Sequence, residues 1–413
     1  MVKKIYSHFM HDSLYRNSIY LMLSTFITAG FGSLFWILAA RFVSADQIGI
    51  ATAIISTSTF IMQFSLFGLK NSIVRYLPKS VTKNAKINTG ANFIIIVSLL
   101  LSVSFLLLLP LISPPLLFLR NNSIYSFLFI LFCISFTLNQ FQEGVFVAYR
   151  STGYVVIKNA LWGVVKVVLP FFLYGLGSFG IFLAFGFGSI ISTLFGIIIL
   201  IIAFHFQLSP FIRRDVIQKM GKFSFGNYLG TVVAYIPQFV LPIIILNNIG
   251  PKENAYYYID QQIANLLYII PIATTQSLFA EGSHDENSMK QHVKKSLFFI
   301  FLLMIPSVGI TIFMGSFVLH IFGHQYAGNG LQFLQLLAFS ALFVSINNVG
   351  TALLNIRKKV ITYILLNIIA ASLFIGFSFL FLSLHLLGIG YAWLIAQGVL
   401  SCIYVFLLRK TIW

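Results

Sequence analysis

The chain has 413 residues, of which 59% are hydrophobic and only 8% are charged, and its formal net charge is +17 at pH 7. A chain this apolar, with polar residues confined to short gaps, is not an ordinary water-soluble protein. Both cysteines, Cys133 and Cys402, fall inside apolar stretches, which argues against an extracytoplasmic disulfide framework and against redox chemistry.

Twelve apolar stretches are each long enough to cross a bilayer, since a hydrocarbon core about 30 Å thick needs roughly 20 residues of helix. In chain order the predicted spans are 17–40, 47–69, 88–111, 123–149, 154–176, 178–204, 223–246, 256–280, 296–319, 330–354, 360–384 and 389–408. The sequence therefore predicts an all-α polytopic membrane protein with twelve transmembrane helices. The gaps are too short for a soluble domain, which excludes an enzyme with a catalytic ectodomain.

Basic residues are concentrated in every second gap. Of the 26 Lys and Arg residues, 22 lie before the first span, after the last one, or at alternate gaps on that same side. Cytoplasmic loops carry an excess of Lys and Arg, so we expect both termini in the cytoplasm. This topology, together with anionic lipid headgroups, accounts for the positive charge without a nucleic-acid partner.

The chain divides near its midpoint. We expect an N-terminal lobe at 1–204, a cytoplasmic linker at 205–222 and a C-terminal lobe at 223–413, with six spans per lobe. An even number of spans per half makes the halves parallel, related by a pseudo-two-fold axis along the membrane normal. Transporters built in this way bind substrate between their halves. The alternative is two helix bundles fused for stability alone.

Several spans contain proline: Pro170, Pro237, Pro242, Pro271 and Pro306. Neighbouring groups or water must satisfy the carbonyls that such prolines free. Pro237 and Pro242 predict a bend that changes between states, or else a static kink that improves packing.

Polar side chains recur at helical spacing on three spans, which places each set on one face. The sets are Thr52, Ser56, Thr59, Gln63 and Lys70 on span 2; Gln261, Asn265, Tyr268 and Thr275 on span 8; and Ser340, Asn347, Thr351 and Asn355 on span 10. Each set alone is compatible with interhelical hydrogen bonding. Because the sets come from both halves, we predict a shared polar cavity.

Ionisable residues inside spans are costly in lipid and usually face a cavity or a partner. Lys166 lies near the middle of span 5 without an acid at its level in the first half, so we predict that it meets an anionic ligand; snorkelling or a second-half acid is the alternative. Glu143 and Lys158 lie at similar depth and can pair. Asp260, near the outer end of span 8, either binds a coupling ion or is a wetted acid at a helix end.

No cofactor is expected. His320 and His324 have helical spacing, but no acidic ligand is nearby, so we predict no metal site. No phosphate-cradling glycine loop, nucleotide-binding motif or nucleophile triad is present, so this chain does not drive transport with ATP.

Short motifs along the whole chain resemble the polysaccharide (Wzx-type) flippases of the MOP exporter superfamily. They are RNSIY (16–20), WILAARF (36–42), QIGIATA (47–53), GLKNSIVRYLP (68–78), IKNALWGVVK (157–166), FGHQYAGNG (322–330) and GIGYAWLIAQ (388–397). Each motif is short, and their order and spacing make the resemblance specific.

The resemblance implies a V-shaped, two-lobed carrier in the bacterial plasma membrane. Such carriers move undecaprenyl-pyrophosphate-linked oligosaccharide repeat units, as in O-antigen assembly, to the outer leaflet by alternating access, coupled to an ion gradient. It also implies that Lys166, Lys158, Arg75 and Lys70, which lie in the matching motifs, face the substrate. A monomer is expected, with membrane lipid and other polysaccharide assembly proteins as partners.

Four other functions compete with this interpretation. A multidrug exporter of the related MATE family needs buried acids for cationic drugs, whereas the spans here are net basic. A flippase for lipid-linked peptidoglycan precursor resembles a longer chain with extra spans. A membrane polysaccharide polymerase or ligase, which would be an enzyme, usually needs a large outer loop. A non-transporting scaffold leaves a mid-bilayer lysine unexplained.

Overall fold

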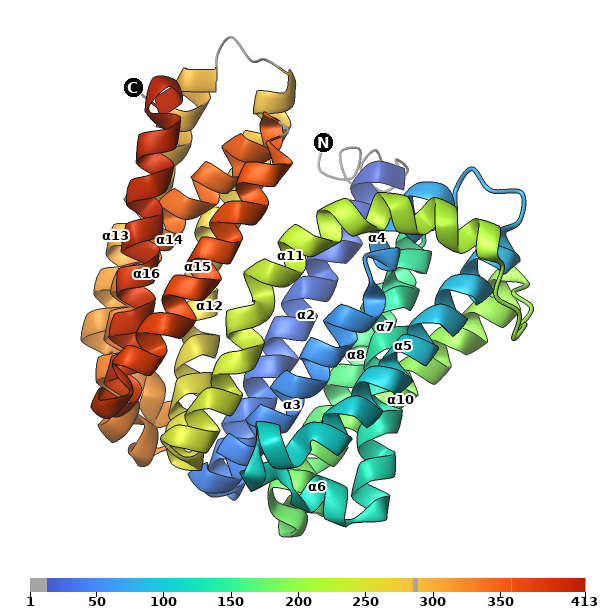
Figure 1. The fold of residues 1–413 in the computed structure, drawn as a ribbon, viewed down its shortest axis with the longest axis horizontal. Helices are drawn as coiled ribbons and strands as arrows, with labels where there is room; N and C mark the ends of the chain where they lie inside the picture. Colours follow the sequence, from blue (N-terminus) through green and yellow to red (C-terminus); the bar gives the residue numbers. More distant parts are fainter. Residues whose placement is uncertain (1–12, 285–288, 358, 413) are drawn as a thin grey trace, which may run out of the picture. The chain divides into compact units, whose positions relative to one another are not determined.

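The computed structural model describes residues 13–284, 289–357 and 359–412, and all regular structure in these ranges is helical (Figure 1). The long helices are α2 (Ser13–Phe42), α3 (Ala45–Leu66), α5 (Lys83–Ile112), α7 (Ser123–Ala148), α8 (Gly153–Val168), α10 (Gly177–Phe204), α11 (Arg214–Asn248), α12 (Pro251–His284), α13 (Met289–Phe322), α14 (His324–Ile356), α15 (Val360–Leu380) and α16 (His385–Ile412). Short elements connect them: α4 (Leu69–Tyr76), η1 (Pro114–Leu116), α6 (Phe118–Asn121), α9 (Pro170–Leu173), η2 (Tyr174–Leu176) and η3 (Leu382–Leu384).

A long helix occupies each of the twelve predicted ranges. By length and composition, nine helical stretches among the described residues can cross a membrane, with Gly153–Phe204 counted as one stretch. The more polar α11 and α12 are not among the nine, although Val232–Asn248 within α11 is a shorter apolar helix.

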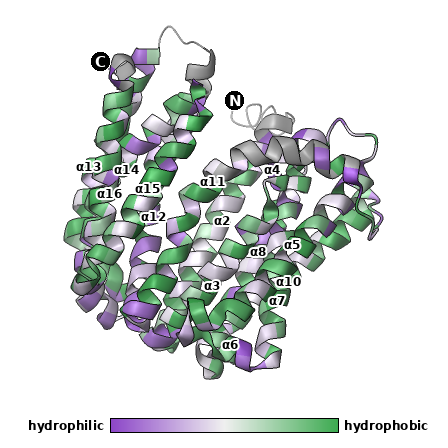
Figure 2. Cartoon of the chain, in the orientation of Figure 1, coloured by the Kyte–Doolittle hydropathy of each residue, from purple (hydrophilic) through white to green (hydrophobic). Residues whose placement is uncertain are grey.

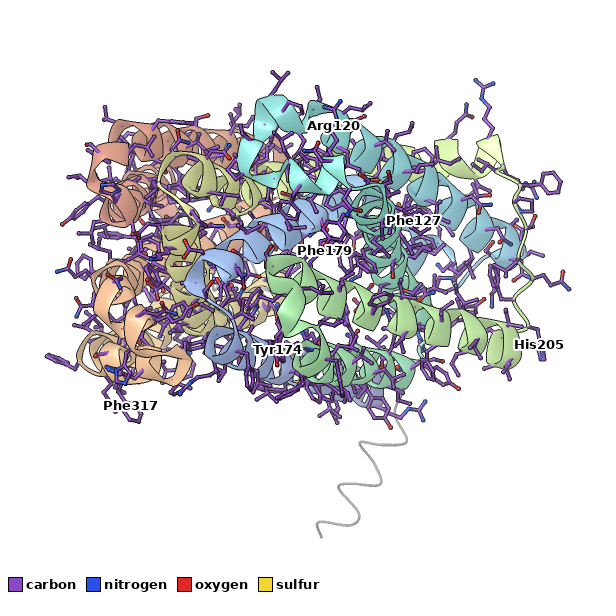
Figure 3. All side chains as sticks on the ribbon, turned by 90° about the horizontal axis from the view of Figure 1, so that it is seen from below. Arg120, Phe127, Tyr174, Phe179, His205 and Phe317 are labelled. Carbon is purple, nitrogen blue, oxygen red and sulfur yellow. The ribbon has the colours of Figure 1, made fainter. Side chains whose placement is uncertain are left out.

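Hydrophobic residues predominate along most of the helix lengths, while hydrophilic residues gather mainly near the helix ends (Figure 2). Large side chains such as Phe127, Tyr174 and Phe317 are exposed, as Figure 3 shows with all side chains drawn. So much exposed apolar surface on a helical protein is explained by contact with lipid. The chain is therefore an all-helical, multi-pass membrane protein.

The chain forms two compact units. Unit 1 comprises Met1–Val43 and Ala53–Tyr228, and unit 2 comprises Ser44–Thr52 and Leu229–Trp413. In unit 1, α8 packs on α2 and α10, and α7 packs on α5 and α10. Small residues permit these contacts, because Gly186 lies against Phe132 and Gly163 lies against Phe31 with no room for a β-carbon.

In unit 2, α14 is the central helix and packs on α12, α13 and α16. Gly350 of α14 lies under the ring of Tyr404 in α16, where a β-carbon would come within 2.3 Å of a ring carbon. The start of α3 also belongs to unit 2, since Asn254 Nδ2 donates to the Gly49 carbonyl at 2.7 Å.

Two local features differ from the prediction for physical reasons. Pro170 does not lie inside a span helix, because α8 ends at Val168 and Pro170 begins α9, where its missing N–H costs nothing. The stretch expected to be a linker at 205–222 is irregular only at 205–213, and α11 begins at Arg214. The irregular segment is held on α5, where Asn88 donates to the Gln207 carbonyl at 2.7 Å and accepts from the Ser209 N–H at 2.9 Å.

Candidate functional site

An ion pair joins α4 to α7 in unit 1. Lys70 Nζ lies 2.8 Å from Glu143 Oε2 and donates to Gln140 Oε1 at 2.7 Å, while Glu143 Oε1 accepts from Asn159 Nδ2 at 3.0 Å. Phe67 and Gly68 have φ of 46° and 70°, and this turn between α3 and α4 brings Lys70 against α7. The direct ion-pair partner of Glu143 in the structure is thus Lys70, whereas Lys158, which lies at similar depth and can pair with it by the sequence, donates its hydrogen bonds to Asn139.

Lys158 is fully buried where α7, α8 and α10 meet. Its ammonium donates to the Asn139 carbonyl at 2.7 Å and to Asn139 Oδ1 at 2.5 Å. Asn139 in turn donates to Ser192 Oγ at 2.8 Å, and Ser192 Oγ donates to the Lys158 carbonyl at 2.9 Å. This closed network corrects the prediction that Lys158 faces the substrate, because the side chain lies inside unit 1.

Lys166 lies about two helical turns further along α8 and is 6% exposed. Its ammonium lies 5.9 Å and 5.7 Å from the ring centres of Trp162 and Phe185, within range for cation–π attraction. No carboxylate among the described residues is within ion-pair distance of it. The exposed Arg75 lies on α4, with its guanidinium 5.7 Å from the Tyr76 ring centre.

Asp260 of α12 is fully buried, so it is not the wetted helix-end acid that one interpretation expected. Both carboxyl oxygens lack a hydrogen-bond partner among the described residues. Gly330 of α14 packs directly on this carboxyl, since a β-carbon there would lie 2.7 Å from Oδ2. The buried hydroxyl of Tyr326, also on α14, is likewise without a hydrogen bond in the described chain.

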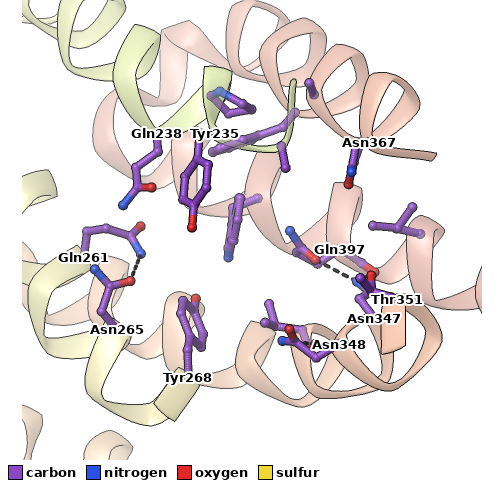
Figure 4. Close-up of a pocket in the computed structure, with 18 of the residues that line it drawn as sticks. Tyr235, Gln238, Gln261, Asn265, Tyr268, Asn347, Asn348, Thr351, Asn367 and Gln397 are labelled. Carbon is purple, nitrogen blue, oxygen red and sulfur yellow. Dashed lines mark hydrogen bonds between the residues drawn. The ribbon is translucent and has the colours of Figure 1, made fainter. Parts of the chain in front are cut away.

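Unit 2 contains a pocket of about 320 Å³ lined by α11, α12, α14, α15 and α16 (Figure 4). None of its twenty lining residues carries a charge. Seven are amides: Gln238, Gln261, Asn265, Asn347, Asn348, Asn367 and Gln397. Six are aromatic: Tyr235, Tyr257, Tyr268, Phe374, Trp393 and Tyr404.

Hydrogen bonds hold part of this lining in place. Asn347 Nδ2 donates to Gln397 Oε1 at 2.7 Å, and Gln261 Nε2 donates to Asn265 Oδ1 at 3.2 Å, as the dashed lines in Figure 4 show. The hydroxyls of Thr351 and Tyr404 lie 2.9 Å apart. These bonds orient the side chains and leave further donors and acceptors of the same groups for a ligand.

The pocket gathers five residues of the polar sets predicted on spans 8 and 10, from α12 and α14: Gln261, Asn265, Tyr268, Asn347 and Thr351. Gln63 lies on the part of α3 in unit 1, and the exposed Asn355 lies beyond the pocket on α14. Residues of α16 were missed. Trp393, Gln397, Leu400 and Tyr404 follow the spacing 0, 4, 7, 11 of one helix face, and that periodicity was the signal available.

The described residues contain no group of three or more His, Cys, Asp or Glu side chains that could hold a metal ion. His320 and His324 are neighbours, with ring centres 4.9 Å apart, and His320 Nδ1 lies 2.7 Å from the carbonyl of Ser316.

Comparison with known proteins identifies the family. The family model described as "Polysaccharide biosynthesis protein" matches residues 14–279, which is well over half of the chain. A candidate O-antigen transporter of Shigella flexneri is 29% identical over 126 residues. That match spans 30% of this chain and only 29% of the relative's length.

Two solved structures share the fold. A structure described as the lipid II flippase MurJ in an inward closed conformation matches with a TM-score of 0.79 at 15% identity, covering 95% of this chain and 87% of that one. An inward-facing multidrug resistance MATE family transporter of the MOP superfamily matches with a TM-score of 0.71 at 17% identity, covering 96% and 98%. The chain therefore belongs to the polysaccharide biosynthesis protein family and has the fold of MOP-superfamily transporters, as the resemblance of its motifs indicated.

Proposed function

We propose that the protein flips undecaprenyl-pyrophosphate-linked oligosaccharide repeat units from the cytoplasmic to the outer leaflet of a bacterial plasma membrane. The observation that carries this function is the amide- and aromatic-lined pocket of unit 2. Amide groups both donate and accept hydrogen bonds, and aromatic rings offer apolar faces, so this lining suits a hydroxyl-rich ligand. The polysaccharide biosynthesis family supports the same substrate class.

The proposal includes twelve membrane spans in two groups of six, with both termini in the cytoplasm, and a monomeric carrier. The distribution of 22 of the 26 Lys and Arg residues on one side supports this topology. In this proposal transport proceeds by alternating access, since multidrug resistance MATE family transporters of this fold are described in inward-facing and in outward-facing conformations.

We assign the pyrophosphate to cations of unit 1. Lys166 is buried without an acidic partner among the described residues, and Arg75 and Lys70 are at least partly accessible. A doubly charged diphosphate needs such partners once it leaves water. In this scheme Glu143 holds Lys70 in place until the substrate competes for it, and Lys158 supports the helix packing.

Ion coupling is assigned to Asp260. An ionised carboxylate without partners is expensive to bury, so the group binds a proton or a metal cation at some stage of the cycle. Asp260 lies on α12 beside Gly330 of α14, and both helices line the pocket. Binding or release of the proton or cation at Asp260 therefore acts on helices that also contact the substrate.

A MATE-like exporter of cationic drugs is the second candidate, and the fold alone favours it. The pocket favours it less, because no acid is among the described residues that line it, so a desolvated organic cation would have aromatic faces as its only stabilising partners.

The deciding experiment compares lipid extracts from cells with and without the gene by mass spectrometry. We expect single undecaprenyl-pyrophosphate-linked repeat units to accumulate in the deletion strain, together with loss of surface polysaccharide. Unchanged lipid intermediates, with increased sensitivity to cationic drugs, would instead establish the exporter.

A further inference from the structure

We infer that the pocket of unit 2 binds an uncharged saccharide portion of the substrate, one or two sugar rings in size, and that it takes neither the pyrophosphate nor an acidic sugar. The inference rests on the proposed function and specifies the chemical class of sugar at this site.

Size is the first argument. The pocket volume of about 320 Å³ lies at the low end of ordinary ligand pockets, which span roughly 300–1,000 Å³. It therefore accommodates a small part of an oligosaccharide, and the rest of the repeat unit and the lipid must lie elsewhere.

Charge is the second argument. A carboxylate or phosphate in this pocket would lose water without meeting a Lys, Arg or His side chain, because none is among the described residues that line it. Burying an ion without a counter-ion is far more costly than burying a hydroxyl that finds a hydrogen bond. An organic cation would likewise meet no acid among the described lining residues and would have only the aromatic faces as partners.

Hydrogen-bonding capacity is the third argument. Asn348 and Asn367 each donate one N–H to a main-chain carbonyl, of Val344 at 3.0 Å and of Gly230 at 3.3 Å, and their side-chain oxygens accept no bond from the described residues. The Tyr268 hydroxyl and the Trp393 indole N–H are buried near each other, and neither has a hydrogen bond of regular geometry among the described residues. Sugar hydroxyls, which both donate and accept, match this mixture of unused groups.

Aromatic faces complete the match. The rings of Trp393 and Phe374 meet edge to face, with centres 4.6 Å apart, which fixes the indole in one orientation. The C–H face of a pyranose ring is apolar and packs on such a ring while its equatorial hydroxyls reach the amides around it. Recognition then combines one apolar face with a rim of neutral polar groups.

The test is a binding series on the purified full chain in detergent. Its probes are undecaprenyl pyrophosphate, the same lipid with an N-acetylhexosamine–hexose disaccharide, which adds no charge, and the same lipid with an N-acetylhexosamine–hexuronic acid disaccharide, which adds one negative charge. We expect the neutral disaccharide lipid to bind at least about tenfold more tightly than each of the other two, the difference that one or two buried hydrogen bonds provide.

Paired variants locate the effect. Asn348→Leu and Trp393→Leu should remove most of the preference for the neutral disaccharide. The control variants are Gln332→Leu on α14 and Phe406→Leu on α16, which change exposed residues of the same helices outside the pocket. Both controls should keep the preference for the neutral disaccharide. Gln261→Lys should raise affinity for the hexuronic acid lipid, and Gln261→Glu should lower it. The higher affinity expected for Gln261→Lys is a gain of binding, which a misfolded protein could not produce, so it distinguishes a binding role from misfolding.

The inference is overturned if the three lipids bind equally, if the hexuronic acid form binds as tightly as the neutral form, or if the pocket variants keep the wild-type preference. The proposed function survives these results when the lipid-linked repeat unit still accumulates in the deletion strain. If the repeat unit does not accumulate and no lipid binds, the proposed function itself fails.

Discussion

Lys158 and Lys166 lie on the same helix, yet their surroundings differ in kind. Lys158 donates two hydrogen bonds to Asn139 and is sealed by its neighbours. Lys166 lies against aromatic rings and makes no hydrogen bond among the described residues. The first lysine stabilises the packing of unit 1, and the second retains donors for a ligand.

This contrast predicts opposite phenotypes for a matched pair of variants. Lys158→Met leaves Asn139 Oδ1 without its donor, whereas the Asn139 carbonyl keeps its main-chain N–H partner within α7. One unsatisfied buried group costs about 1–3 kcal/mol, so the midpoint of thermal unfolding in detergent should fall by a few degrees. Lys166→Met leaves no described hydrogen-bond acceptor without its donor, so this variant should unfold near the wild-type temperature. Its transport of the lipid-linked repeat unit should nevertheless be reduced. Equal loss of stability in both variants would show that Lys166 is also a packing residue.

Asp260 allows a test that preserves shape. Asp260→Asn replaces the carboxyl with an amide of nearly the same size, which cannot exchange a proton and binds cations poorly. We expect the variant to fold and to bind substrate, but to lose the stimulation of transport by an imposed pH or sodium gradient in proteoliposomes. Full stimulation in Asp260→Asn would exclude this residue from coupling.

At the scale of elements, the helices could be predicted well because the bilayer dictates them. Each apolar run had to satisfy its own backbone hydrogen bonds, so span length alone located all twelve long helices to within several residues at most ends. The departures occur where polar sequence continues a helix beyond the apolar run, as at the start of α11, and where proline divides one, as at Pro170.

The partners of the polar residues could not be predicted in the same way. Depth in the span suggested Lys158 for Glu143, but the turn at Phe67 and Gly68 delivers Lys70 instead. Stripes on α12 and α14 correctly marked faces of the pocket, whereas its α11, α15 and α16 walls depend on helix rotations that a single sequence does not specify. Helical periodicity identifies the residues that share one face of a helix, whereas tertiary packing determines which residues that face contacts.

The junction of α3 with α12 gives a prediction for an element contact. A β-carbon on Gly49 would lie 1.7 Å from the carbonyl oxygen of Pro251, so Gly49→Ala requires the two helix starts to separate. We expect a markedly lower yield of folded protein and a lower unfolding temperature. Gly309→Ala on α13, where a β-carbon meets nothing within 4 Å, should be neutral or slightly stabilising. Similar behaviour of the two variants would mean that the α3 contact is not maintained in the membrane.

At the scale of the whole molecule, the proposed topology can be tested by thiol labelling. Val81 and Asn121 are exposed and lie beyond opposite ends of α5, whose 30 residues span about 45 Å. In a background with Cys133→Ser and Cys402→Ser, a membrane-impermeant maleimide added to intact cells should label Asn121→Cys and spare Val81→Cys. Permeabilised cells should label both. The reverse pattern in intact cells would place the termini outside.

The neutral lining of the unit 2 pocket has an electrical consequence. Moving one elementary charge through the membrane is worth about 2.3 kcal/mol per 100 mV, and a pocket whose described lining has no ionised side chain adds nothing to that work. The response of transport to voltage should therefore come from the diphosphate, its unit 1 cations and the ion on Asp260. Exchanging one neutral sugar for another at the pocket changes affinity and leaves the gating charge of the cycle unaltered.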